Sequence, residues 1–173
     1  YKRQTLSQVR NGVRAMGEEN MNEKLYRGGN YEASGYDAWM TPPEILDPLT
    51  EEFGALFDPC PTNPTFDGLS IDWPTNQVCF VNPPYSRLSD WCAKCAEQWR
   101  CGCTVILIIP PRTCASYFHN HIVGNAEIRF IRGRVKFLHP DGGKPKGAPF
   151  PSILCVFRGK GRGRGNQTAR GEA

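Results

Sequence analysis

The middle of the chain consists of short apolar runs separated by polar and proline-rich segments. The run TVILIIP, at 104–110, does not alternate between polar and apolar positions, which is typical of a strand buried on both faces of a parallel sheet. Two shorter runs, ALFD at 55–58 and VCFV at 78–81, also have the length of buried strands. The segment 59–77 is rich in proline and is predicted to form loops.

Two segments have apolar residues at the spacing of one helical face. The first is predicted to begin at a Thr41 cap, with prolines in its first positions, and to end at Gly54. The second covers 89–100 and has Ser89 as its candidate cap. We expect such helices to cover both faces of the sheet.

The last third of the chain is richer in strands. The pattern predicts strands at 127–131, 134–138 and 152–157, and a mobile loop in the Gly- and Pro-rich stretch at 139–151. Strand–helix alternation followed by these strands predicts an α/β fold. Its sheet would be open and mostly parallel, with antiparallel strands at its C-terminal end. In such sheets ligands bind beyond the carboxyl ends of the strands.

The chain is expected to have three parts. Residues 1–30 would form an N-terminal extension that is partly helical or disordered, and 31–158 would form one domain. Residues 159–173 would be a disordered basic tail, because arginines interleaved with glycines cannot pack. The formal net charge is +4 and the basic residues gather near the two ends, which fits a polyanionic partner or a solubilising tail equally well.

Composition narrows the class of protein. The chain has 173 residues, 39% hydrophobic and 22% charged, which is ordinary for a globular protein. No apolar stretch approaches the ~20 residues needed to span a bilayer, so no membrane partner is expected. The eight cysteines are scattered through predicted helices and strands, which favours buried, reduced thiols over a metal site. His119 and His121 are expected at a solvated helix end.

The stretch FVNPPYS, at 80–86, places Asn82 and Tyr85 around two prolines at the exit of a predicted strand. Each proline fixes its own φ and restrains the residue before it. Pro83 and Pro84 also lack an N–H, so we expect their carbonyls to have no local donor. The predicted result is a rigid corner with acceptor oxygens and a flat ring, which suits a planar group with an exocyclic amine, such as adenine or cytosine. The alternative is a stiff loop without function.

The motifs WMTPPEI, FDPCPTN, SIDW and FVNPPYS, in this order, resemble those of DNA amino-methyltransferases that use S-adenosylmethionine. The resemblance is best to the short adenine-N6 methyltransferases of bacteriophages and prophages, and it extends from about Trp39 to Phe157. It implies a Rossmann-like methyltransferase fold and a site-specific DNA adenine methyltransferase. The enzyme would flip the target adenine out of the duplex and methylate it directly.

The resemblance also implies roles for individual residues. The catalytic tetrad would be Asn82, Pro83, Pro84 and Tyr85, with Tyr85 stacking on the flipped base. Residues expected to contact S-adenosylmethionine are Thr41, Pro42, Asp58, Pro59, Cys60 and Asp72, with Asp72 at the adenine amino group of the cofactor. Because 173 residues hold no separate recognition domain, DNA contacts are expected from Arg112, Arg132 and Arg134 and from the stretch HPDGGKPKGAPF, unless selectivity is loose.

The chain also departs from the usual pattern. PCPTNP, which follows the first predicted strand, has no glycine, so its cofactor loop must be built differently. No acidic residue clearly matches the one that commonly holds the cofactor ribose, and Asp67 is one option. Arg129 and its neighbours Arg132 and Arg134 alternate with apolar residues, so a role on a solvated sheet face is as open as a phosphate contact.

Two other functions remain open at this stage. One is methyl transfer to RNA, to cytosine N4 or to protein glutamine, and the other is a catalytically inactive DNA-binding protein of the same fold. The expected location is the cytoplasm, in a bacterial host if the chain is encoded by a phage or prophage, or the nucleus if the source is eukaryotic. The sequence leaves a monomer and a homodimer equally open.

Overall fold

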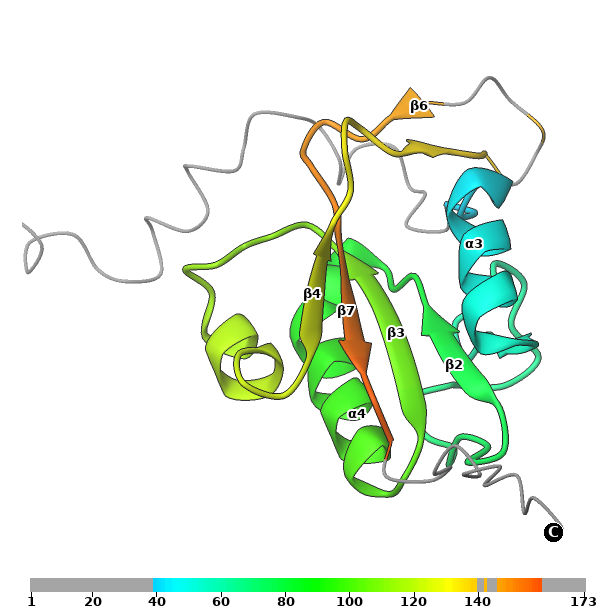
Figure 1. The fold of residues 1–173 in the computed structure, drawn as a ribbon, viewed down its shortest axis with the longest axis vertical. Helices are drawn as coiled ribbons and strands as arrows, with labels where there is room; N and C mark the ends of the chain where they lie inside the picture. Colours follow the sequence, from blue (N-terminus) through cyan, green and yellow to red (C-terminus); the bar gives the residue numbers. More distant parts are fainter. Residues whose placement is uncertain (1–38, 140–141, 143–145, 160–173) are drawn as a thin grey trace, which may run out of the picture. The chain divides into compact units, whose positions relative to one another are not determined.

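A five-stranded sheet is the centre of the fold in the computed structural model, which describes residues 39–139, 142 and 146–159 (Figure 1). The predicted extension at 1–30 and the tail after Gly159 lie outside these residues. In sheet order the strands are β1 (Leu56–Phe57), β2 (Val78–Val81), β3 (Thr104–Ile109), β7 (Ile153–Phe157) and β4 (Glu127–Phe130).

The sheet is mostly parallel, as predicted. β1, β2 and β3 pair in parallel, and β7 is antiparallel to both of its neighbours, β3 and β4. β4 therefore runs in the same direction as β1–β3. The prediction of antiparallel strands at the C-terminal end of the sheet is thus confirmed for β7 and wrong for β4. The carboxyl ends of β2, β3 and β4 meet at one edge, at the top of Figure 1. We call this the carboxyl edge.

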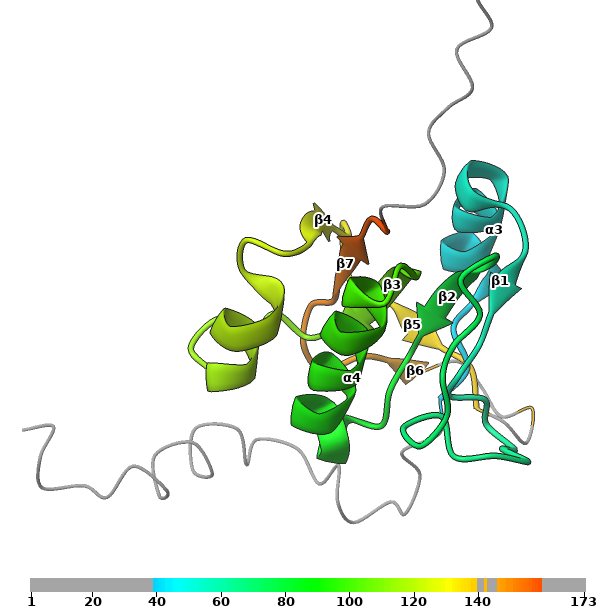
Figure 2. The ribbon, with the colours of Figure 1, turned by 90° about the horizontal axis from the view of Figure 1, so that it is seen from below.

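Hydrophobic cores lie on both faces of the sheet, as the uninterrupted apolar run predicted. The odd-numbered residues of β3 from Val105 to Ile109 belong to a core with helix α4 (Leu88–Arg100), whereas Ile106 and Ile108 belong to a core with helix α3 (Pro43–Phe53). Figure 2 shows these helices on opposite sides of β2 and β3. The two helices thus cover the two faces of one sheet.

Both predicted helix caps are wrong. α3 begins one residue later than expected, so its N-cap is Pro42, and no side chain forms a capping hydrogen bond. α4 begins at Leu88, which places Ser89 inside the helix, and Arg87 is the N-cap, again without a side-chain bond. The side chain of Thr41 is therefore left for another role.

A small two-stranded sheet pairs part of the strand predicted at 134–138 with part of the stretch where a mobile loop was expected. β5 (Lys136–Phe137) pairs antiparallel with β6 (Lys146–Gly147), and the Ala148 N–H donates to the Val135 carbonyl at 2.9 Å. Val135, Phe137 and Ala148 are buried in the core under α3. Part of the Gly- and Pro-rich stretch is therefore ordered by packing. Figure 1 shows this hairpin beyond the carboxyl edge.

Two other predictions concern the remaining residues. Five of the eight cysteines are buried and none of the eight is in a disulfide, and burial raises the pKa of the thiols of Cys79, Cys92 and Cys155 to about 12. His119 and His121 lie in a short π-helical turn, η3 (Phe118–Ile122). None of the helices within the described residues is both long enough and apolar enough to cross a membrane.

Candidate active site

Asn82 is half-buried directly after β2, at the carboxyl edge of the sheet. Its side-chain amide donates from Nδ2 to the main-chain oxygen of Trp39, 2.6 Å away. A carbonyl oxygen can only accept, so the nitrogen of the amide must face Trp39 and Oδ1 must face the other way. No donor to Oδ1 is found among the described residues, so Oδ1 is held as an oriented acceptor.

The two prolines after Asn82 differ in their surroundings. Pro83 is less than 2% exposed, so a ligand reaches its carbonyl only after neighbouring atoms move. The Pro84 carbonyl accepts the Arg87 N–H at 3.0 Å in the short 3-10 helix η2 (Tyr85–Arg87). The expectation that both proline carbonyls lack a local donor is therefore wrong for Pro84.

Tyr85 lies at the start of η2 with its ring half-buried against the core under α4. The ring of Phe150, from the segment before β7, lies 5.5 Å away between centroids, at a tilt of 52°. The aromatic ring that follows Asn82 in the chain therefore contacts a second ring, which comes from the segment predicted to be a loop. The sequence identified Tyr85 and missed Phe150.

Residues 39–41 run along this corner. Met40 and Leu138 form an isolated antiparallel bridge with two main-chain hydrogen bonds, at 3.0 and 2.9 Å, which ties the segment to the end of β5. Two side-chain atoms of the segment, Trp39 Nε1 and Thr41 Oγ1, are buried and have no hydrogen-bond partner within the described part of the chain. Buried polar groups normally have partners, so these two atoms are free to bond with a group outside the described residues, such as a polar ligand.

A second group of residues follows β1, the neighbour of β2. The Asp58 carboxylate accepts the Cys60 N–H at 2.8 Å, and Pro59 between them is fully buried. Desolvation raises the pKa of Asp58, opposed by the hydrogen bond from Cys60, although part of the residue is solvent-exposed. An ionised Asp58 would therefore gain from a positively charged partner such as an amine.

Gly68 brings the next loop against the end of β1. A Cβ atom at this position would lie 1.9 Å from the Pro59 oxygen, so only glycine allows this approach. Asp67 is thereby placed near the carboxyl end of β1. Its exposed carboxylate accepts from Ser70 Oγ at 2.6 Å and from the Leu69 N–H at 3.0 Å, and these bonds lower its pKa.

Asp72, in contrast, lies at the opposite edge of the sheet. It accepts from Gln98 Nε2 at 3.2 Å, and Gln98 is a buried residue near the end of α4. Gln98 also accepts the Trp73 N–H at 2.9 Å, and the Trp73 carbonyl accepts from Cys103, the residue before β3. The length of β2, roughly 13 Å for its four residues, therefore separates Asp72 from Asn82. The structure does not bring these two predicted site residues together.

Of the three arginines predicted to contact DNA, each follows the carboxyl end of a strand. Arg112 follows β3 and is half-buried, whereas Arg132 and Arg134 follow β4 and are exposed. Arg134 also donates to the Ala148 carbonyl at 3.3 Å, which helps to hold the β5–β6 hairpin.

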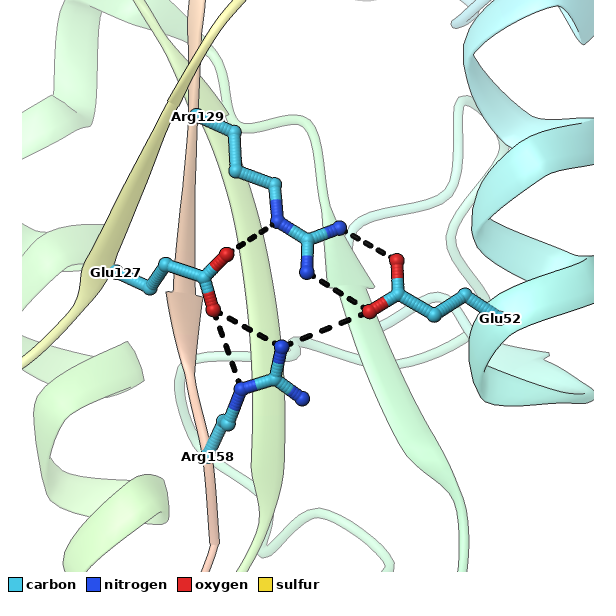
Figure 3. A network of polar contacts seen from close by, with 4 residues as sticks. All are labelled: Glu52, Glu127, Arg129 and Arg158. Carbon is cyan, nitrogen blue, oxygen red and sulfur yellow. Dashed lines mark hydrogen bonds and ion pairs between the residues drawn. The ribbon is translucent and has the colours of Figure 1, made fainter.

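Arg129 has a structural role, which was one of its two open interpretations. It donates to Glu52 of α3 and to Glu127, and Arg158 pairs with the same two carboxylates (Figure 3). These hydrogen bonds lower the pKa of Glu52 and Glu127. The network connects α3 to β4 and to the end of β7, so Arg129 and Arg158 are engaged with protein carboxylates.

A comparison with protein families gives one match. The family model described as DNA N-6-adenine-methyltransferase (Dam) matches residues 28–168, which include every candidate site residue discussed above. No match was found among curated proteins or among solved structures.

Proposed function

Because the chain belongs to the DNA N-6-adenine-methyltransferase (Dam) family, we propose that it transfers a methyl group from S-adenosylmethionine to the N6 amine of adenine in DNA. The main support from the structure is Asn82, whose amide is oriented by Trp39 at the carboxyl edge of the sheet. In sheets of this kind, ligands bind beyond the carboxyl ends of the strands. A hydrogen-bond acceptor that is held in a fixed orientation at this edge is therefore suited to bind an exocyclic amine.

The segment 39–41 and the end of β1 have polar groups that could bind a polar cofactor. Trp39 Nε1 and Thr41 Oγ1 are buried donors that lack a partner among the described residues, and the backbone of Pro42 continues from them into α3. Asp58, Pro59 and Cys60 lie at the end of the adjacent strand β1. S-adenosylmethionine, when bound, supplies an electrophilic methyl group. Thr41 and Asp58 would hold its polar groups.

The acidic contact to the cofactor is better assigned to Asp67 than to Asp72. Gly68 packs against Pro59, which places Asp67 on the carboxyl side of β1, whereas Gln98 holds Asp72 beside the start of β3. A single ligand at the carboxyl edge reaches the first of these carboxylates and is separated from the second by the length of β2.

Asn82 would act on the substrate amine. This amine is a weak nucleophile because its lone pair is delocalised into the ring of adenine. When Asn82 Oδ1 accepts one N–H, and the Pro83 carbonyl accepts the other after its neighbours move, a pyramidal nitrogen is favoured and its lone pair becomes available. Orientation and electrostatics would supply the acceleration without a covalent enzyme intermediate. As the new N–C bond formed, the bond from sulfur to the methyl group would break, S-adenosylhomocysteine would leave, and the amine would lose one proton to solvent. The flipped base would stack on Tyr85.

One assay tests this proposal. The protein is incubated with S-adenosylmethionine labelled in its methyl group and with unmethylated DNA or RNA, and the nucleosides are separated after digestion. We expect label in N6-methyladenine from DNA. Label in N4-methylcytosine or in RNA would assign a different substrate, and DNA binding without transfer would indicate an inactive member of the family.

A further inference from the structure

Phe130 is the most exposed of the large hydrophobic residues that the structure describes. Its exposed fraction is 84%, compared with 52% for Val123 and 36% for Met40. It is the last residue of β4, which is an edge strand of the sheet. An aromatic ring this exposed is stabilised when a partner covers it.

The strand register places Phe130 at the same edge as the candidate site. Val81 is level with Leu107 of β3, Leu107 with Cys155 of β7, and Cys155 with Ile128 of β4. Asn82 and Phe130 therefore lie one and two residues beyond this common level. Three strand spacings separate them, roughly 14 Å along the sheet. This distance corresponds to about four base pairs of a duplex, in which the phosphates of each strand are about 3.4 Å apart along the axis.

The residues after Phe130 are basic. The segment 128–139 contains no aspartate or glutamate. Arg129 is engaged by Glu52 and Glu127 (Figure 3), whereas Arg132 and Lys136 are exposed to solvent. An aromatic ring followed by exposed cations is complementary to nucleic acid, whose bases stack on rings and whose phosphates attract cations.

We propose that Phe130, Arg132 and Lys136 form a contact surface for duplex DNA, with the Phe130 ring stacking on bases that are opened when the target adenine leaves the helix. This inference rests on the proposed function. It adds a surface about three strands away from Asn82 that acts in opening the duplex. A base in single-stranded DNA is already unpaired, so the ring is needed for duplex substrates only.

Phe130→Ala tests this surface through the ratio of methyl transfer on duplex DNA to transfer on single-stranded DNA of the same sequence. Loss of stacking on one base predicts a fall in duplex activity of about tenfold or more, with single-stranded activity nearly unchanged. Phe130→Trp keeps a ring and should keep the ratio. Val123→Ala is the matched control, because Val123 is exposed and precedes β4 at the opposite edge of the sheet.

Several outcomes would overturn the inference. One is an unchanged ratio in Phe130→Ala. Another is equal loss on both DNAs together with a change in the oligomeric state measured by sedimentation, which would assign Phe130 to an interface with a second copy. If the wild-type protein methylates neither DNA, the proposed function fails. Binding to a labelled duplex then still decides the role of Phe130, which is supported by weaker binding of Phe130→Ala and excluded by equal binding.

The proposed phosphate contacts of Arg132 and Lys136 are tested by the dependence of DNA binding on salt concentration. Each phosphate contact that is removed should reduce the slope of log binding constant against log salt concentration by about one. We expect Arg132→Ala and Lys136→Ala each to do so on duplex DNA. Slopes equal to that of the wild type would remove these two cations from the surface.

Discussion

The side chain of Asn82 donates a hydrogen bond to the main-chain oxygen of Trp39, 2.6 Å away and 43 residues earlier in the chain. This bond connects the proline-braced corner to the segment that contains Thr41, whose hydroxyl is buried without a partner in the described part of the chain. One side chain therefore orients the acceptor proposed for the substrate amine and also anchors the wall proposed for the cofactor.

Asn82→Ala should abolish methyl transfer and leave cofactor binding nearly intact. The reason is that Oδ1 is proposed to contact the substrate, whereas Met40 stays tied to Leu138 without Asn82. A loss of about a hundredfold or more in transfer is expected by analogy with other oriented hydrogen-bonding groups in active sites. Transfer assays and calorimetric titration with S-adenosylmethionine measure the two effects.

Ser89→Ala is the matched control for Asn82→Ala, because Ser89 is exposed at the start of α4 and makes no capping bond. It should leave both transfer and stability unchanged. Joint loss of transfer and cofactor binding in Asn82→Ala would instead assign Asn82 to the support of the segment 39–41.

Asp67→Asn and Asp72→Asn should have different effects on cofactor binding. Each change keeps the shape of the side chain, so Leu69 and Gln98 can still donate to Oδ1. We expect the dissociation constant for S-adenosylmethionine to rise about tenfold in Asp67→Asn and to stay the same in Asp72→Asn. The opposite ranking in calorimetric titration would restore the assignment of Asp72 made from the sequence.

The sequence predicted the features that depend on local pattern. The run at 104–110 gave a strand with two buried faces, and the apolar residues before Asn82 placed it at the carboxyl edge. Contacts between distant segments were not predictable, such as the bond to Trp39, because no local pattern encodes them. The same holds for the contact between the rings of Phe150 and Tyr85, which come from distant parts of the chain.

The two incorrect helix caps and the separation of Asp72 from Asn82 have different causes. Thr41 and Ser89 are residue types that favour caps, but Thr41 lies one residue before the N-cap of its helix and Ser89 lies two residues after the N-cap of its helix. Asp72 is close to Asn82 in sequence and lies before β2, so it is at the opposite end of that strand. Asp67 was already one option from the sequence, and what the three-dimensional structure adds is the close packing of Gly68 on Pro59, which places Asp67 near the end of β1.

The network in Figure 3 should make stability depend on pH. The pKa of Glu52 and of Glu127 is lowered from 4.5, chiefly by hydrogen bonds from Arg129. Because the folded state holds these carboxylates ionised, their contribution is present above about pH 4.5 and is lost as the pH falls through the folded pKa. Arg129→Met should therefore lower the free energy of unfolding by about 1 kcal/mol at neutral pH, and by less in acid or in high salt.

Urea unfolding at several pH values measures this dependence. Glu97→Gln is the control, because within the described residues Glu97 pairs only with Lys94, one turn away in α4. It should change stability by a few tenths of a kcal/mol at most. A deficit in Arg129→Met that stays constant from neutral to acid pH would mean that Arg129 stabilises the fold by packing over Phe53 instead.

Gly68→Ala should strongly destabilise the protein, because its Cβ would lie 1.9 Å from the Pro59 oxygen and 3.1 Å from the Trp91 ring. Relieving that overlap must move main-chain atoms at the end of β1, which costs about 1–3 kcal/mol or more. Gly147→Ala is the matched control, since nothing lies within 4 Å of its Cβ position and its φ is not in the left-handed region. Denaturant unfolding compares the two variants. Equal stability would show that the loop carrying Asp67 does not pack on Pro59, and the assignment of Asp67 to the cofactor end of the sheet would lose its support.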